Sequence, residues 1–372
     1  MLFYRLGIYR IFTGICILVL SNIFVSCVPN TPYTPTISEM PTQKVIPETR
    51  LPIIPVTSPA PSITPAIAIS STQTFTPITT PVLPPLSIAS MRSSNYPGSD
   101  IKVEKILERG YNYDRYIASY LSEGLKIYAL LTVPDSKQLD SKFPVIIFNH
   151  GYIAPKEYKT TERYVVYVDA FAKRGYIVFK PDYRGHGNSE GTPSGAYSSP
   201  AYTIDVLNAV SSIKKYPQAE PSRIGMWGHS MGGQITLRSM VITKDVKVGV
   251  IWAGVVAPFY DIINNWRHAR RPGLTPQPTH TPDSSESVID YSAIVSPNSF
   301  LLDLSGPLQL HHGTSDPTVP LAFSETLYKQ IKKAGGMVEF YTYEGDNHNI
   351  AINFSLAMYR TLSFFDRYLK AP

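Results

Sequence analysis

The sequence predicts an α/β fold in which a mainly parallel central sheet carries helices on both faces. From about residue 140 onward, segments of strand length alternate with longer segments of helical length, an order that requires crossover connections. Two strand segments joined by a short turn precede them and predict an antiparallel hairpin. The composition, 43% hydrophobic and 12% aromatic residues in a chain of 372, is sufficient for a large core.

The predicted elements follow one another in a regular order. Residues 113–120 and 125–134 form the hairpin, because Ser122-Glu123-Gly124 between them is a turn signal. Later strands are predicted at 144–149, 176–181, 223–228, 247–253, 307–311 and 338–343. Helices are predicted at 160–174, 202–216, from 231, at 321–334 and at 350–369, with an irregular stretch after 253. In such a sheet, functional side chains gather at the carboxyl ends of the strands.

Residues 1–27 predict a signal peptide or lipoprotein signal. Two arginines are the only charges among the first ten residues, and eighteen uncharged, mostly apolar residues follow at 11–28. The motif Phe24-Val25-Ser26-Cys27 resembles the lipobox of bacterial lipoproteins, with Phe24 in place of the usual Leu, which makes Cys27 the lipidation candidate. A signal without lipid and an uncleaved anchor stay open as alternatives. In each case the rest of the chain is expected to be exported, outside the cytoplasmic membrane.

Residues 28–90 predict a disordered tether rich in Pro, Thr and Ser. Fourteen of the 33 prolines fall between 29 and 90, a stretch without glycine and with only four charged residues. Because proline removes a backbone donor and restricts the residue before it, neither helix nor sheet can persist there. We expect a stiff, extended spacer. A single globular domain is expected at 91–372, with a lid or cap insertion at 255–305, of which 272–282 are expected to be a solvent-exposed loop.

Charge and cysteine content exclude several classes of function. The net charge is +6 without long runs of Lys or Arg, so no nucleic-acid partner is expected. Both cysteines, Cys16 and Cys27, precede the globular part, which therefore has no disulfide and no cysteine-based zinc site. Nothing in the sequence calls for a metal or an organic cofactor. The expected partners are a small-molecule or short peptide substrate and, through the N-terminal lipid or anchor, a membrane.

The pattern G-x-S-x-G, typical of a nucleophilic serine at a tight strand-to-helix turn, occurs twice. Ser189 is the first such serine, but Thr192-Pro193-Ser194-Gly195 after it cannot begin a helix promptly, so it is predicted to be a loop serine. Ser230 lies directly between a predicted strand and a predicted helix, with Gly228 and Gly232 around it. A serine that only caps the helix would not require both glycines. The sequence therefore predicts Ser230 as the nucleophile.

A serine hydroxyl needs a base, and the base needs an orienting carboxylate. His348 lies in the polar loop after the last strand, so it is the predicted base. Asp316 follows the strand at 307–311 and is the predicted acid. Asp346 is its rival, but a carboxylate two residues from His348 would have to fold back on its neighbour. His150 and His186 precede glycines in loops, and His229 lies beside Ser230 in the turn but is expected to point elsewhere. The remaining four histidines are expected to be surface or supporting residues: His268, His280, His311 and His312.

The reaction also needs hydrogen-bond donors for the oxyanion that develops on the carbonyl oxygen. The backbone N–H of Met231, at the start of the helix after Ser230, is one predicted donor. The second is expected in the loop after the strand at 144–149, and we assign it to the backbone N–H of Tyr152. Gly151 permits close approach there, and its own N–H stays open as the alternative.

These features together resemble the α/β-hydrolase superfamily and, within it, the catalytic domain of the prolyl oligopeptidase family (peptidase family S9). The chain order of serine, aspartate and histidine is that of α/β-hydrolases. The resemblance covers about residues 140–370 and also rests on the segments 171–176, 182–187 and 220–225. It implies an α/β-hydrolase catalytic domain at 91–372. Asp182 and Arg184 are expected to form a structural ion pair.

The expected function is that of an exported serine hydrolase that cleaves an acyl bond through an acyl-enzyme. The resemblance favours a serine-type peptidase of the prolyl oligopeptidase type. Only about fifty residues, 91–140, precede the hydrolase core, so the β-propeller common in that family is not expected, and specificity is expected to lie in 255–305. A carboxylesterase with the same catalytic residues and a non-catalytic binding module stay open as alternatives.

Overall fold

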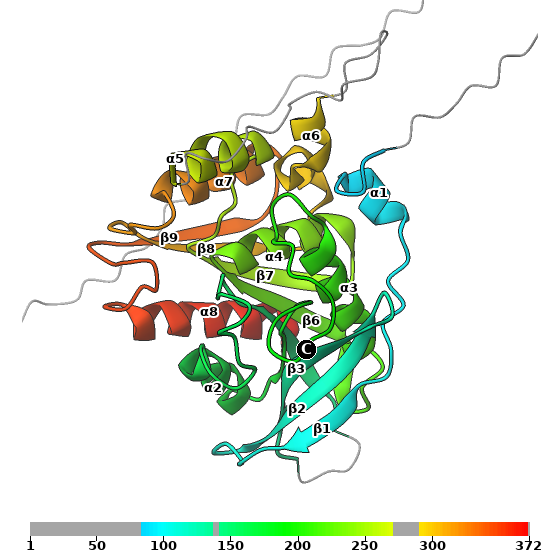
Figure 1. Cartoon of the computed structure of the whole chain (residues 1–372). Helices are drawn as coiled ribbons and strands as arrows, with labels where there is room; N and C mark the ends of the chain where they lie inside the picture. The colour runs from blue at the N-terminus through cyan, green and yellow to red at the C-terminus, as the bar shows by residue number, and fades with distance from the viewer. Residues whose placement is uncertain (1–82, 137–140, 271–289, 371–372) are drawn as a thin grey trace, which may run out of the picture. The chain divides into compact units, whose positions relative to one another are not determined.

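The computed structural model describes residues 83–136, 141–270 and 290–370, and one nine-stranded sheet lies at its centre (Figure 1). The strand order is β1-β2-β3-β5-β4-β6-β7-β8-β9. The first three strands and β5 pair antiparallel, and all pairs from β5 to β9 are parallel. The strands are β1 (Lys102–Ile106), β2 (Tyr113–Ser122), β3 (Leu125–Pro134), β4 (Phe143–Asn149), β5 (Ile177–Pro181), β6 (Ala219–His229), β7 (Val246–Trp252), β8 (Leu308–Gly313) and β9 (Val338–Tyr343).

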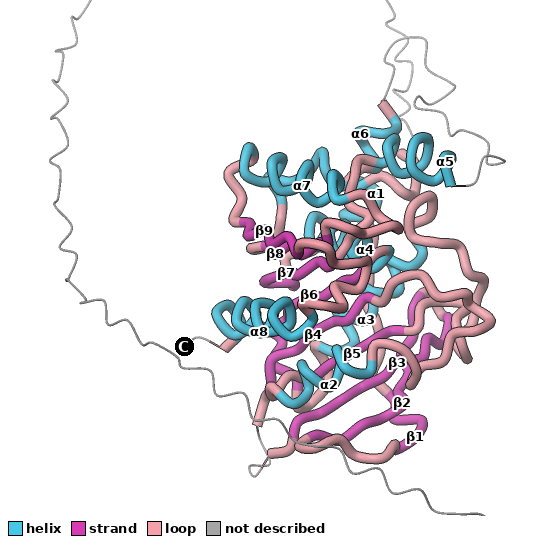
Figure 2. Tube along the Cα trace, turned by 90° about the vertical axis from the view of Figure 1, so that its left-hand side faces the viewer, coloured by secondary structure: helices cyan, strands magenta, loops and turns pink. Residues whose placement is uncertain are grey.

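Helices cover both faces of this sheet (Figures 1 and 2). The pair α2 and α8 packs on one face, and α3, α4 and α7 pack on the other. Each face buries its own apolar core, because parallel strands between helix layers have no solvent side. The helices are α1 (Ile88–Ser93), α2 (Val165–Lys173), α3 (Ala201–Ile213), α4 (Met231–Ile242), the π-helix η1 (Asp261–Arg267), α5 (His268–Arg270), α6 (Tyr291–Val295), the 3-10 helix η2 (Pro297–Asp303), α7 (Leu321–Lys333) and α8 (Phe354–Leu369).

The predicted fold class is confirmed, and the differences lie at element boundaries and in elements that were not predicted. The helix predicted from 160 begins only at Val165, because Arg163 and Tyr164 have φ angles of 58° and 55°, and left-handed residues cannot start a right-handed helix. The strand β1 was not predicted. All five of its residues are exposed, so it lacks the alternation of apolar and polar residues by which a half-buried strand is recognised.

The ordered structure also begins earlier than residue 91. Residues 83–90, which the sequence analysis places in the tether, form a turn and the start of α1. Ser87 caps this helix by accepting a hydrogen bond from the N–H of Ser90, and Leu86 and Ile88 are buried. Apolar residues at the end of the proline-rich stretch therefore pack onto the globular domain, which the proline count could not show.

The insertion predicted at 255–305 is described in part. Its described residues form η1, α5, α6 and η2, and they share a small apolar core with Val319, which follows β8 in the chain. Residues 272–282, predicted to be an exposed loop, lie outside the described residues, as do Cys27 and the chain up to residue 82. None of the helices in the described part combines the length and the hydropathy that a bilayer span requires.

Candidate functional site

Ser230 lies at the sharp turn between β6 and α4. Its φ of 55° and ψ of −116° fall outside the regions that a residue with a side chain normally adopts. The turn is held by backbone hydrogen bonds from the Ser230 N–H to Trp252 O (3.0 Å) and from the Gly233 N–H to Ser230 O (3.0 Å). A strained serine at such a turn is the geometry of a nucleophile elbow, which presents the hydroxyl at the carboxyl end of the sheet.

The glycines around Ser230 are required by close packing. A side chain at Gly228 would collide with the backbone of Gly232, and one at Gly232 would collide with the carbonyl of Asn149 on the neighbouring strand β4. Both contacts are with backbone atoms, which cannot move aside as a flexible side chain can. The elbow therefore fits against β4 only with glycine at these positions.

Ser189, the serine of the second G-x-S-x-G pattern, has a structural partner instead. Its hydroxyl oxygen accepts a hydrogen bond from the backbone N–H of Tyr128 on β3 (2.9 Å), and the residue lies in the loop after β5, whose next helix, α3, begins only at Ala201. It ties the loop after β5 to the edge of the hairpin. Ser189 therefore does not lie at the N-terminus of a helix, as the serine of a nucleophile elbow does.

Asp316 and His348 lie in the loops after β8 and β9, and the structure brings them into contact. The His348 Nδ1–H donates to Asp316 Oδ2 at 2.7 Å. The other oxygen of the carboxylate accepts hydrogen bonds from the N–H groups of Thr318 (2.7 Å) and Val319 (3.0 Å). A carboxylate held from both sides fixes the orientation of the imidazole, as an orienting acid must.

The rival carboxylate, Asp346, is fully buried and has another role. It accepts hydrogen bonds from the backbone N–H groups of Ile352 (2.7 Å) and Asn353 (3.0 Å) and from the Asn353 side chain (2.8 Å). These donors belong to the turn that leads into α8. Asp346 therefore organises the loop that carries His348, whereas Asp316 contacts the imidazole itself.

A second histidine, His312, also contacts the carboxylate of Asp316. Its Nε2 lies 3.1 Å from Asp316 Oδ2, and its Nδ1 is 2.7 Å from the Ser324 hydroxyl. Burial alone would raise the pKa of Asp316, but the hydrogen bonds from His312, His348 and the Val319 amide outweigh it and hold the pKa well below its usual range. Asp316 therefore stays ionised. In the sequence, the position of His312 four residues before Asp316 is the one signal that points to this contact.

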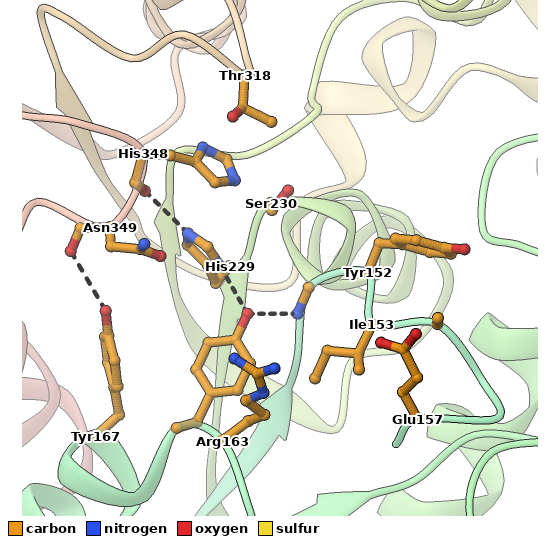
Figure 3. A pocket seen from close by; sticks show the side chains of 13 residues that line it. Tyr152, Ile153, Glu157, Arg163, Tyr167, His229, Ser230, Thr318, His348 and Asn349 are labelled. Carbon is orange, nitrogen blue, oxygen red and sulfur yellow. Dashed lines mark hydrogen bonds between the residues drawn. The ribbon is translucent and has the colours of Figure 1, made fainter.

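The chain of hydrogen bonds through His229 was not foreseen. Its Nε2–H donates to the backbone carbonyl of His348 (3.0 Å), so its Nδ1 accepts from the Tyr164 hydroxyl (2.8 Å), which in turn accepts the Gly151 N–H (2.9 Å) (Figure 3). Burial lowers the pKa of His229 to about 3, so the ring stays neutral and keeps this tautomer. These three hydrogen bonds join the loop after β4 to the loop after β9.

This chain of hydrogen bonds also bears on the oxyanion donors. Because the Gly151 N–H already donates to Tyr164, of the two candidate amides in this loop that of Tyr152 is the better placed to meet a substrate. Met231 is the first residue of α4, and both Tyr152 and Met231 line the cavities next to Ser230. No signal in the sequence identifies Tyr164, since its contact depends on the left-handed turn before α2.

The ion pair expected between Asp182 and Arg184 is wrong. Arg184 pairs with the buried Asp205 on α3 (2.7 Å) and with Glu123 (2.9 Å). Asp182 is fully buried and accepts hydrogen bonds from the hydroxyls of Tyr158 and Thr160. On an extended strand, residues two apart would point to the same side. The chain turns at Tyr183, whose φ is 58°, so the side chains of Asp182 and Arg184 point away from each other.

The site opens into a cavity of about 730 Å³ (Figure 3). His229, Ser230 and His348 lie together at its wall, and the rings of the two histidines are 4.6 Å apart. A smaller cavity of about 280 Å³ also reaches Ser230 and is lined by residues of η1 and α5. The two share Tyr152, Ser230 and Thr318. Within residues 83–136, 141–270 and 290–370, no group of His, Cys, Asp and Glu side chains is arranged to hold a metal ion.

A buried histidine near the site predicts acid sensitivity. His311 on β8 is fully buried between Tyr343 and Gln309 (both 2.7 Å), and burial lowers its pKa to about 3 from an ordinary 6.5. The unfolded chain binds this proton near pH 6.5 and the folded one only near 3. Above about pH 6.5 the histidine is neutral in both states, so it does not reduce the free energy of unfolding. As the pH falls from about 6.5 towards 3, the unfolded chain binds the proton first, and the free energy of unfolding decreases.

We expect His311→Gln to flatten this loss. The pKa of Asp182, raised to about 6 by burial, contributes with the opposite sign between about pH 6 and 4, so wild type alone would not isolate the effect. The difference in urea-unfolding free energy between wild type and His311→Gln should grow in the variant's favour between about pH 7 and pH 4. Parallel curves would contradict the assignment.

The chain resembles known hydrolases in sequence and in fold. The sequence profile of the prolyl oligopeptidase family matches residues 164–372. A probable dipeptidyl-aminopeptidase B of Metarhizium robertsii is 24% identical over 250 residues, which are 64% of this chain and 26% of that protein. The chain thus spans about a quarter of the length of this relative.

Two solved structures share the fold. The acylaminoacyl peptidase of Pyrococcus horikoshii has a TM-score of 0.56 at 22% identity, and the match covers 70% of this chain and 43% of that one. Est1E from Butyrivibrio proteoclasticus, solved with ferulic acid bound, has a TM-score of 0.51 at 22% identity, covering 68% of this chain and 99% of that one. The fold is therefore found in an acylaminoacyl peptidase and in Est1E, a protein solved with ferulic acid bound.

Proposed function

Since this chain belongs to the prolyl oligopeptidase family and is a serine hydrolase, we propose that it is a serine-type peptidase that works through an acyl-enzyme. The observation that carries the proposal is the contact between His348 and Asp316 at the wall of the cavity that also holds Ser230. It supports the roles of base for His348, orienting acid for Asp316 and nucleophile for Ser230.

In the first half of the proposed reaction, Ser230 Oγ bonds to the carbonyl carbon of the substrate, and its proton passes to His348 Nε2. The carbonyl oxygen becomes an oxyanion, which accepts hydrogen bonds from the N–H groups of Met231 and Tyr152. The bond from carbon to the leaving group then breaks, and the leaving amine or alcohol takes the proton from His348. Asp316 stays ionised throughout and stabilises the imidazolium that forms between these steps.

In the second half, water replaces the leaving group. His348 takes a proton from the water as its oxygen bonds to the acyl carbon, and the same donors hold the second oxyanion. The bond to Ser230 Oγ breaks, the serine recovers its proton from His348, and a carboxylic acid leaves. No step needs a redox partner or a group outside the chain other than water.

A carboxylesterase with the same residues is the second candidate, because ester and amide substrates differ mainly in how much their leaving group depends on protonation by His348. We expect measurable kcat/KM on short peptidyl p-nitroanilides as well as on p-nitrophenyl esters. A preference of several orders of magnitude for esters over every anilide would replace the peptidase by an esterase. Failure on both, with no labelling by a fluorophosphonate, would leave the non-catalytic binding module.

We also propose, from the sequence alone, that the enzyme is exported and tethered to a membrane through Cys27 or an uncleaved anchor, by way of the spacer up to residue 82. Cys27 and that spacer lie outside the described residues. If the proposal is right, the expressed chain fractionates with membranes, and Cys27→Ser releases it when a lipid is the anchor. A wild-type chain found only in the cytoplasm would contradict it.

A further inference from the structure

Two cavities meet at Ser230, and His348 lines only the larger of them. The larger cavity, of about 730 Å³, is lined by His348 and Asn349, and the leaving group must lie there because His348 gives it a proton. The smaller cavity, of about 280 Å³, is lined by Met231 and by η1 and α5 but not by His348. It is therefore the acyl chamber, the space for the part of the substrate that stays bound to Ser230. This assignment rests on the proposed function.

Two arginines project into the acyl chamber. Arg267 ends η1, and Arg270 is three residues further on, so both lie on one side of this helical segment. The Arg267 guanidinium lies over the ring of Tyr197, 5.6 Å from its centroid, and that of Arg270 lies over Trp266 at 5.7 Å. Stacking on the rings fixes the position of each guanidinium but leaves its charge in place.

Neither arginine is neutralised by a described residue. Among the described residues, Arg270 donates to the backbone carbonyls of Pro317 (3.3 Å) and Thr318 (3.0 Å), and neither Arg267 nor Arg270 forms an ion pair with a described carboxylate. In contrast, five arginines elsewhere in the described part bind carboxylates: Arg92, Arg109, Arg174, Arg184 and Arg367. No described Asp or Glu lines the acyl chamber, whereas Glu157 and Arg163 both line the larger cavity.

This arrangement favours an anion as the occupant. Two like charges on one wall repel each other, and a carboxylate between them would turn this repulsion into two charge-assisted hydrogen bonds. A purely apolar acyl group would leave the half-buried guanidinium of Arg267 without a counter-ion, which costs free energy, whereas Arg270 is exposed and keeps its two carbonyl acceptors. The wall is also anchored, since the Trp266 Nε1–H donates to Thr318 O (3.1 Å), two residues after Asp316.

We propose that the acyl chamber selects substrates whose acyl group carries a carboxylate, bound by Arg267 and Arg270. In a peptide this is an acidic side chain on the residue whose carbonyl is attacked, and in an ester it is a dicarboxylic acid joined through one end. The preference for the anion arises on the acyl side only, because the larger cavity carries charges of both signs.

The test compares, on the full-length protein, two p-nitrophenyl esters that share the same six-carbon acyl chain. They are the mono-p-nitrophenyl ester of adipic acid, an anion, and p-nitrophenyl methyl adipate, its neutral counterpart. We expect wild type to prefer the anion in kcat/KM by about tenfold or more, the effect of one good charge pair. Raising NaCl from about 20 to 500 mM should reduce this preference, since salt screens the attraction.

The variants locate the effect. Arg267→Gln and Arg270→Gln should each lower the ratio of kcat/KM for the anionic ester to kcat/KM for the neutral ester several-fold, and the double variant should bring this ratio close to one. Arg267→Lys should retain part of the preference. The control is Arg223→Gln, a half-buried arginine in the first half of β6 that does not line either cavity, which should keep the full preference.

Three outcomes would overturn the proposal: equal rates on both esters in wild type, a preference for the neutral ester, or a preference for p-nitrophenyl 3-phenylpropionate over the anion, which would make the chamber a site for aromatic acyl groups. In all three the protein still hydrolyses esters, so the proposed acyl-enzyme mechanism stands and only the anion preference falls. If no ester is hydrolysed and a fluorophosphonate does not label the protein, the proposed function itself fails, and the substrate class falls with it.

Discussion

Replacing Ser230 by Ala is expected to abolish both turnover and labelling by a fluorophosphonate probe. Without the hydroxyl no acyl-enzyme forms, and the loss in kcat for removing a nucleophile of this kind is on the order of a million-fold. The variant should still fold. Alanine has no new bulk, and the hydrogen bonds that hold the elbow use the backbone of Ser230 and Gly233 rather than the hydroxyl. Near-wild-type thermal unfolding would show that the loss is chemical.

The matched control is Ser189→Ala, at the second G-x-S-x-G pattern. Its hydroxyl accepts the Tyr128 N–H, so this change should lower the unfolding free energy by about 1 kcal/mol while leaving the labelling unchanged. The two variants thus distinguish two serines that share a sequence pattern but differ in their surroundings. If Ser189→Ala lost the labelling and Ser230→Ala kept it, the assignment of the elbow would be wrong.

Much of the site was predictable because its residues follow from strand order. In a parallel sheet the carboxyl ends of neighbouring strands meet, so residues after β6, β8 and β9 come together although more than a hundred residues separate the first from the last. Asp316 and His348 are neighbours for this reason. The glycines at 228 and 232 add a local constraint that is visible in the sequence and that the packing against β4 explains.

The remaining features were hidden because they depend on how loops fold over the sheet. Tyr164 reaches Gly151 and His229 only because two left-handed residues turn the chain before α2. Arg184 pairs with Asp205, a residue on a helix 21 positions later, and not with the aspartate two positions before it. Both contacts need the tertiary positions of segments that carry no pattern of their own.

The second large effect is expected for Asp316→Asn, which should lower kcat by about 10⁴-fold. The amide oxygen can still accept the N–H groups of Thr318 and Val319, so the loop keeps its shape. The amide nitrogen then faces His348 Nδ1 and donates to it, which forces the imidazole into the other tautomer. His348 Nε2 now carries the hydrogen and cannot take the proton of Ser230, so chemistry stops while substrate binding, measured as KM, changes little.

The matched control is Asp346→Asn, which tests the rival carboxylate next to His348 in the sequence. Asp346 accepts three hydrogen bonds from the turn before α8, so this variant should unfold at lower urea concentration but keep kcat within several-fold of wild type. Stability and kcat should thus separate, with Asp316→Asn losing activity and Asp346→Asn losing stability. If Asp346→Asn lost activity as Asp316→Asn does, then the 2.7 Å contact of His348 with Asp316 would not be the one that orients the base.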